Sequence, residues 1–219
     1  MRYKGILFDL DGTLLDTSEG IIESVRHTIS SLGLPDLNTE ALKTFVGPPV
    51  QESFKKYFGI DEAKAQEAAD IFRSYYKETA LFLAKPYPGI HVLLEQLIKN
   101  NLRIGVATYK REDYAKTLLE HFDIAPFCDS ICGADNENKL TKTDIIIKCL
   151  HDLSLQAKET VLIGDTIHDA RGASNAGIPF IGVAYGFGFG SRNDSIPYPC
   201  VRYVVTVEEL EDAIFAGNK

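Results

Sequence analysis

The chain has 219 residues, of which 45% are hydrophobic, enough for the core of one large domain or of a domain with a smaller insertion. Its formal net charge of −8 and pI of about 5.2, with no block of basic residues, exclude a general attraction to nucleic acid or to an anionic membrane. The sequence has no run of eighteen apolar residues, and the apolar stretch near the N-terminus is too short for a signal peptide, so we expect a cytoplasmic protein.

The first part of the chain is one short strand followed by a helical segment. The apolar run Gly5-Ile6-Leu7-Phe8 predicts a buried strand that ends at Asp9. No strand-like alternation occurs between residues 18 and 84. Apolar spacing instead predicts helices, in chain order, over residues 22–33, 39–46, 50–58 and 61–83.

The proline- and glycine-rich stretch 85–89 marks a break, after which strands and helices alternate. The predicted strands are 102–107, 130–133, 160–163, 179–183 and 202–205. The predicted helices are 90–98, 114–122, 141–153, 168–176 and 207–215. Such alternation is typical of an α/β fold, a parallel sheet with helices on both faces that binds its ligand beyond the carboxyl ends of the strands.

The cysteine pattern argues against a structural zinc site. Only one close pair occurs, and no second pair completes a zinc-binding motif. We therefore expect free thiols, mostly buried, at Cys128, Cys132, Cys149 and Cys200.

Two aspartates follow the first strand, in the sequence Asp9-Leu10-Asp11-Gly12-Thr13. Two carboxylates 4 Å apart repel by about 4 kcal/mol at an effective dielectric constant near 20, so a site that keeps both ionised needs a cation. Oxygen ligands favour a hard cation such as Mg²⁺. A polar turn after a strand is the alternative interpretation of these five residues, because Asp and Gly are common turn residues.

Other predicted strand ends supply further polar groups. Thr108 follows the second strand, Asp165 and Asp169 follow the fourth, and Lys142 lies at the start of a helix. Carboxylates with Mg²⁺, a lysine and a hydroxyl are the groups that phosphoryl transfer requires. Each has an ordinary alternative: Thr108 as a strand-end residue, Lys142 as a solvated lysine whose neighbour Lys139 could replace it, and the two aspartates as helix caps.

These motifs resemble those of haloacid dehalogenase superfamily phosphatases, in the branch of phosphoglycolate phosphatases and 5′-nucleotidases. The resemblance covers essentially the whole chain, and its most specific parts are Asp9-Leu10-Asp11-Gly12-Thr13 and Gly164-Asp165-Thr166-Ile167-His168-Asp169. It implies a Rossmann-like core of residues 1–15 and 86–219, with the first strand at the centre of the sheet. It also implies that residues 16–85 form an all-helical cap over the site.

The resemblance implies the following roles for the motif residues. Asp9 is the nucleophile and Asp11 the general acid and base, Thr108 binds the phosphoryl group, and Lys142 positions the nucleophile and the phosphate. Mg²⁺ is the cofactor, and its ligands are Asp9, the backbone carbonyl of Asp11, Asp165 and, directly or through water, Asp169.

Substrate selection is expected to depend on the cap. The candidates for substrate contacts are Gly12, Tyr109 and, in a stiff loop between cap helices, Gly47 and Pro48. A simple helix–helix turn is the alternative for that loop. The glycine-rich stretch 185–190 lacks the following helix of a dinucleotide site and resembles a loop of the 5′-nucleotidase-like members.

The sequence thus favours a Mg²⁺-dependent phosphomonoesterase that acts on a small phosphorylated metabolite, such as phosphoglycolate or a 5′-nucleotide, through an aspartyl phosphate. The alternatives are a sugar phosphomutase of the same fold and a non-catalytic binding protein. Neither nucleic acid nor a membrane is expected as a partner, and the sequence does not decide between a monomer and a homodimer.

Overall fold

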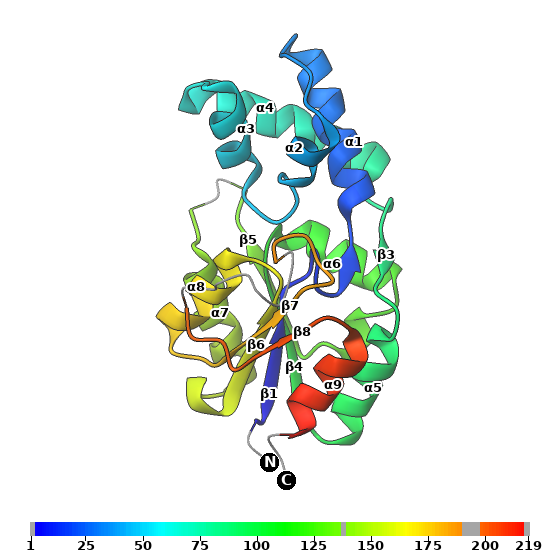
Figure 1. Cartoon of the computed structure of the whole chain (residues 1–219), viewed down its shortest axis with the longest axis vertical. Coiled ribbons are helices and arrows are strands. Elements are labelled where there is room, and N and C mark those ends of the chain that lie inside the picture. The colour runs from blue at the N-terminus through cyan, green and yellow to red at the C-terminus, as the bar shows by residue number, and fades with distance from the viewer. Residues whose placement is uncertain (1–2, 137–138, 190–197, 217–219) are drawn as a thin grey trace.

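A six-stranded parallel sheet forms the centre of the molecule (Figure 1). The computed structural model describes residues 3–136, 139–189 and 198–216. The strand order is β5-β4-β1-β6-β7-β8, so β1 lies inside the sheet, and the predicted α/β fold is confirmed. The strands are β1 (Gly5–Phe8), β4 (Arg103–Arg111), β5 (Ser130–Ala134), β6 (Thr160–Gly164), β7 (Phe180–Val183) and β8 (Arg202–Val204).

Helices cover both faces of this sheet because the side chains of its strands alternate between two apolar clusters. Ile6 and Phe8 of β1 belong to the cluster packed by α5, α6 and α9, whereas Leu7 belongs to the one packed by α7 and α8. These helices are α5 (Ile90–Lys99), α6 (Glu112–His121), α7 (Lys142–Leu153), α8 (Ile167–Ala176) and α9 (Val207–Ala216), with short 3₁₀ turns η2 (Ala125–Phe127) and η3 (Ala157–Glu159).

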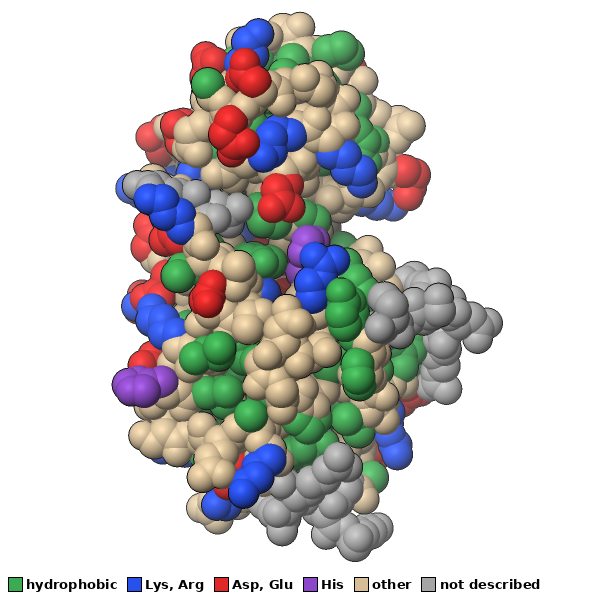
Figure 2. All heavy atoms as spheres, turned by 90° about the vertical axis from the view of Figure 1, so that its left-hand side faces the viewer, with side chains coloured by type: hydrophobic (Ala, Val, Ile, Leu, Met, Phe, Trp, Pro, Cys, Tyr) green, Lys and Arg blue, Asp and Glu red, His purple; other side chains and the backbone are tan. Residues whose placement is uncertain are grey.

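Residues 17–84 form a helical insertion above the carboxyl ends of the strands (Figure 1). It enters and leaves the core through a two-stranded antiparallel pair, in which Leu15 faces Pro86 and Asp16 faces Lys85. Figure 2 shows the surface indented where the insertion meets the core. The segments are β2 (Leu15–Asp16), α1 (Ser18–Ser31), α2 (Thr39–Lys43), α3 (Val50–Phe58), α4 (Glu62–Tyr75), the π-helical η1 (Tyr76–Ala80) and β3 (Lys85–Pro86).

Two predicted elements differ in extent from the structure, and one pair of strands was not predicted. The helix predicted over 61–83 ends at Tyr75 and continues as a π-helical turn, a form that is often found at functional sites. The strand predicted over 102–107 extends to Arg111 after a register shift against β5. The β2–β3 pair was not predicted, because two-residue strands carry no periodic signal.

The cysteines are free thiols, of which Cys132 and Cys149 are buried and the other two half-buried. None of the helices in the described part of the chain combines the length and the hydropathy that a membrane span requires.

Because helices cover both faces of the sheet, we expect two phenylalanines to differ greatly in their contribution to the free energy of unfolding. Replacing the buried Phe180 of β7 by alanine should lower the free energy of unfolding by about 3–5 kcal/mol, because it leaves a cavity in the core. Phe82→Ala, at a side chain that is 48% exposed, should cost less than about 1 kcal/mol. Urea denaturation of both variants measures the difference, and equal losses would contradict this packing.

Candidate active site

The carboxylates at the sheet edge come from neighbouring elements. Asp9 directly follows β1 and Asp165 directly follows β6, and these parallel strands pair with Phe8 opposite Ile163. Asp169 lies in the first turn of α8. One carboxylate oxygen from each of Asp9, Asp165 and Asp169 lies within 4.8 Å of the others, and we call these three residues the carboxylate cluster.

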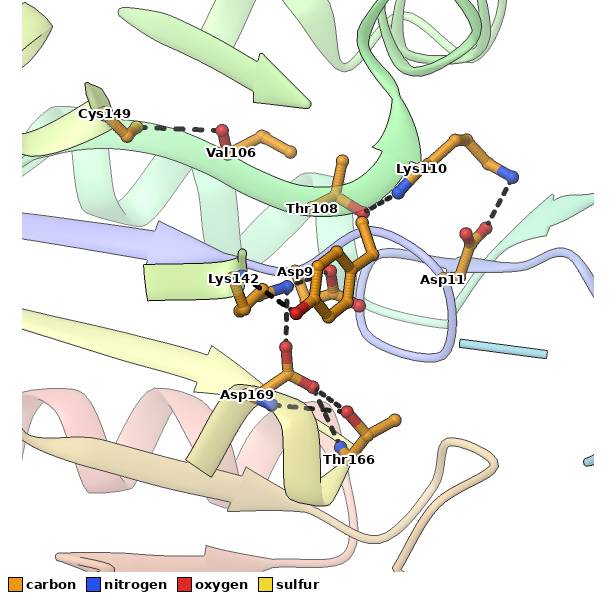
Figure 3. A network of polar contacts seen from close by, with 10 residues as sticks. Asp9, Asp11, Val106, Thr108, Lys110, Lys142, Cys149, Thr166 and Asp169 are labelled. Atoms are coloured by element: carbon orange, nitrogen blue, oxygen red, sulfur yellow. Dashed lines mark hydrogen bonds and ion pairs between the residues drawn. The ribbon is translucent and has the colours of Figure 1, made fainter. Parts of the chain in front are cut away.

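Lys142 supplies a positive charge to this cluster (Figure 3). Its Nζ lies 2.6 Å from Oδ1 of Asp9 and 2.6 Å from Oδ1 of Asp169, and the lysine is 2% exposed. Thr141 and Asp144 form a capping box that fixes Lys142 at the start of α7. The alternative, Lys139, is exposed, so the structure brings Lys142 to the carboxylates.

Asp169 combines two functions that the sequence presented as alternatives. Its Oδ2 accepts hydrogen bonds from the amide of Thr166 at 3.0 Å and from Oγ1 of Thr166 at 2.6 Å, as a helix-capping residue does. Its Oδ1 faces Lys142. The cap of α8 therefore orients a carboxylate of the cluster.

Burial dominates the electrostatics of this cluster. It raises the pKa of Asp9 to about 7, against the opposing effect of Lys142, while the charges of Asp169 and Asp11 raise it further. Burial, followed by the charges of Asp169 and Asp9, also raises the pKa of Asp165 well above its usual range. For Lys142 burial acts to lower the pKa, but Asp169 and Asp9 outweigh it, so the pKa is raised and the ammonium stays charged.

The cluster has the donor set of a divalent metal site. Oδ2 of Asp165 accepts from the amides of Phe187 at 2.7 Å and Gly188 at 3.3 Å. Oδ1 of the same carboxylate is buried and has no hydrogen-bond partner among the described residues. An oriented oxygen of this kind beside two further carboxylates fits a hard cation.

The loop that supports Asp165 was not assigned this role from the sequence. A Cβ on Gly186 would lie 2.3 Å from the carbonyl oxygen of Gly12 and 2.4 Å from Oδ2 of Asp165, so only glycine allows this approach. The loop covers residues 185–189, and the predicted Gly190 lies outside the described residues. The glycines of this loop were visible in the sequence, but its contact with Asp165, 22 residues before Phe187, was not.

Asp11 is oriented away from the carboxylate cluster. Its Oδ1 accepts from Oγ1 of Thr17 at 2.6 Å. The same oxygen lies 3.1 Å from Nζ of Lys110 (Figure 3). Lys110 also donates to the hydroxyl of Tyr76 in the helical insertion at 3.0 Å. The side chain of Asp11 is therefore not in the cluster, and its predicted contact with a metal through the backbone carbonyl stays a prediction.

Lys110 was not among the residues proposed from the sequence. Burial acts to lower the pKa of Lys110, but Asp11 and then Tyr76 act to raise it and together outweigh burial. The pKa is therefore raised, and this lysine also stays charged. Its position two residues after Thr108 in an extended strand is the signal that could have found it, since alternate side chains share a face.

Thr108 and Tyr109 lie at the same end of β4. Thr108 is 1% exposed, and its Oγ1 accepts from the amide of Lys110 at 3.1 Å, which leaves the hydroxyl hydrogen for donation. The hydroxyl of Tyr109 accepts from the amide of Lys142 at 2.9 Å, so this ring ties β4 to the start of α7.

A cavity of about 90 Å³ lies between the sheet edge and the helical insertion. Gly47, Pro48 and Tyr109, three of the predicted substrate contacts, line it together with Asp11. Gly12 instead packs against Asp165 with a φ of 80°, and its amide donates to the carbonyl of Leu15 at 2.8 Å. Its predicted contact with substrate stays a prediction.

Comparison with known proteins shows the family of the chain. Residues 6–183 match the family of haloacid dehalogenase-like hydrolases. A 5′-nucleotidase of Pseudomonas aeruginosa is 38% identical over 189 residues, which cover 86% of each protein. A Mycobacterium tuberculosis protein named tyrosine-protein kinase PtkA is 32% identical over 210 residues, covering 95% of this chain and 72% of that protein.

A crystal structure of a predicted phosphatase from Clostridium acetobutylicum matches with a TM-score of 0.92 at 36% identity, covering 99% of this chain and 100% of that one. The chain therefore belongs to the haloacid dehalogenase-like hydrolase family, as its motifs predicted, and is a phosphatase of that family.

Proposed function

We propose that this phosphatase hydrolyses the phosphomonoester of a small metabolite, with Asp9 as its nucleophile. The observation that carries the proposal is the buried carboxylate of Asp9 at the end of β1, 2.6 Å from the ammonium of Lys142. A buried lysine beside a carboxylate supplies the positive charge that a phosphoryl group needs when it approaches an anionic nucleophile.

The proposed reaction has two displacements at phosphorus. An oxygen of Asp9 bonds to phosphorus while the bond to the leaving oxygen breaks, and Asp11 gives that oxygen its proton. Water then attacks the aspartyl phosphate, Asp11 accepts the proton of the water, and phosphate leaves with Asp9 restored. Thr17 and Lys110 hold the carboxylate of Asp11 in place for both proton transfers.

Two further residues bind the phosphoryl group. The hydroxyl of Thr108 donates to a phosphoryl oxygen, and the ammonium of Lys142 neutralises another. The carboxylate cluster, with the backbone carbonyl of Asp11, would hold Mg²⁺, which when bound supplies positive charge to the phosphoryl oxygens.

We propose that residues 16–85 act as a cap and that the 47–48 segment and Tyr109 contact the leaving group, since they line the cavity beside Asp11. The relative named 5′-nucleotidase supports a nucleotide substrate. Phosphoglycolate is the other candidate from the sequence, and the cytoplasmic location stays a prediction.

Removing the nucleophile should abolish turnover. Asp9→Asn should lower kcat for phosphate release by about 10⁴-fold or more, because an amide does not displace the leaving oxygen. The matched control is Asp36→Asn in the exposed loop after α1, which should retain wild-type activity. Phosphate release measured over a panel of phosphomonoesters tests the proposal. Turnover by Asp9→Asn near the wild-type rate would remove Asp9 from this role, and isomerisation without net release would indicate a phosphomutase.

Metal removal tests the carboxylate cluster. Activity should be lost in EDTA and return with Mg²⁺. Asp165→Asn should raise the Mg²⁺ concentration for half-maximal activity by about 10- to 100-fold, since it replaces a charged ligand by a neutral one. Titration of both proteins with Mg²⁺ measures the shift. An unchanged midpoint would exclude Asp165 as a ligand.

The raised pKa of Asp9 predicts a pH-dependent stability of the metal-free protein. The carboxyl group keeps its proton up to about pH 7 in the native state but loses it near 3.8 in the unfolded chain, so its contribution to stability falls as the pH rises between these values. In EDTA, the Tm of the wild type minus that of Asp9→Asn should therefore decrease from pH 5 to pH 8. The subtraction cancels other groups such as His168, whose pKa burial lowers. A difference that increases with pH would contradict the raised pKa.

A further inference from the structure

The cavity beside Asp11 is the space available to the leaving group, an inference that rests on the proposed function. Asp11 gives its proton to the leaving oxygen, so the atoms attached to that oxygen extend from Asp11 into the cavity. Aromatic side chains form much of its wall, and at about 90 Å³ it is small. The chemistry of the far wall therefore bears on which leaving groups bind.

A buried arginine lies on that wall. Arg73 is in the last turn of α4, three residues before Tyr76, whose hydroxyl accepts from Lys110 beside Asp11. Residues three apart on a helix lie on the same side, so Arg73 and Tyr76 both face the cavity. The side chain of Arg73 is 13% exposed, and burial is the main cause that lowers its pKa.

One nitrogen of the Arg73 guanidinium is not satisfied by its neighbours. Its Nη1 is buried without a hydrogen-bond partner in the described part of the chain. Two carboxylates act on it. Oδ1 of Asp70 lies 3.7 Å away, beyond hydrogen-bond distance, and already accepts from Nε2 of Gln66 at 2.9 Å. The charge of Asp135, which also lines the cavity, has a smaller effect on Arg73 than that of Asp70. A buried cation without a close partner is costly, which favours an anion that arrives with a ligand.

The other arginine of the cavity differs in this respect. Both Nε and Nη2 of Arg111 donate to the carboxylate of Asp113, and Nη1 donates to Oδ1 of Asn136 at 3.0 Å. Arg111 therefore adds positive potential near Arg73 but has its donors in use. Arg73 has a buried nitrogen without a partner among the described residues. Lys110, the remaining cation named in the wall, is instead held by Asp11 and Tyr76.

We propose that the preferred substrate carries a second anionic group, a carboxylate or a second phosphate, a few bonds from the scissile phosphate, and that Arg73 binds this group. The planar guanidinium suits both oxyanions, since it pairs two N–H groups with two oxygens. Arg73 is thus a specificity residue of the helical insertion. A phosphomonoester whose leaving group is neutral, such as a nucleoside 5′-monophosphate, lacks this contact. Of the two proposed substrate classes, the inference therefore favours phosphoglycolate over a simple 5′-nucleotide.

The test compares substrates of matched shape. Phosphoglycolate is paired with 2-hydroxyethyl phosphate for the carboxylate, and propane-1,3-diol bisphosphate with 3-hydroxypropyl phosphate for the phosphate. The readout is the ratio of kcat/KM for the anionic member to that for the neutral member. The wild type should prefer one of the anionic members by at least about 10-fold, which also shows which anion binds.

The variants are Arg73→Gln, Arg73→Lys and, as the control, Arg26→Gln, which removes an exposed arginine of α1 outside the cavity. Arg73→Gln should lower the ratio by about 10- to 100-fold, mainly through KM of the anionic substrate, since a charge-assisted contact is lost. Arg73→Lys should give an intermediate ratio, because lysine keeps the positive charge but lacks the planar pair of N–H groups. Arg26→Gln should keep the wild-type ratio.

Several outcomes would overturn the inference. One is a wild type that hydrolyses both members of each pair equally well, and another is an Arg73→Gln variant that loses activity on both in equal proportion. If Arg73→Gln does not fold, the same ratio of kcat/KM values is measured for Arg73→Lys. A ratio and a KM equal to those of the wild type in Arg73→Lys would reject the contact. No phosphate release from any phosphomonoester would instead reject the proposed function itself.

Discussion

Buried negative charge at the end of the central strand is the constraint on which the site depends. The carboxylate cluster holds three acidic groups within 4.8 Å, and Lys142 supplies one positive charge to them. Two carboxylates 4 Å apart repel by about 4 kcal/mol at an effective dielectric constant near 20. One lysine therefore does not balance three ionised aspartates, and protons or a divalent cation must supply the rest. The capping box of α7, the cap of α8 and the glycine loop 185–189 all serve to hold these charges in place.

The two aspartates of the first motif contact different lysines. Asp9 and Asp11 are two residues apart, yet Lys142 faces the first and Lys110 the second. Asp9 is thus surrounded by other carboxylates, while Asp11 is bound by a hydroxyl and an ammonium. Environment rather than residue type gives neighbouring carboxyl groups different chemistry. Through Tyr76, Lys110 also ties the helical insertion to Asp11, so the same contact that orients Asp11 fixes one wall of the cavity.

The parts of the site that sequence reasoning found are those that local rules determine. Asp9 and Asp165 follow apolar strands, and parallel strands bring their carboxyl ends to one edge. Lys142 lies within a Thr-x-x-Asp capping sequence, directly after its threonine, and this sequence marks the helix start. Lys110 was missed because β4 extends beyond its apolar run, with a register shift that only pairing with β5 produces. Arg73 was missed because a charged residue in a polar helix looks solvated until tertiary packing buries it.

The β2–β3 pair has a consequence for how this chain tolerates change. Leu15 and Asp16 lie beside Pro86 and Lys85, so the chain leaves the core and returns to it at one point. The ends of the inserted segment are held together by the core, and the entropy of closing a loop grows only slowly with its length. A segment of another size or shape can therefore replace residues 17–84 without altering the register of the six-stranded sheet. Such an arrangement lets the insertion diverge among descendants of one ancestor while the carboxylate cluster and Lys142, which lie in the core, are inherited unchanged.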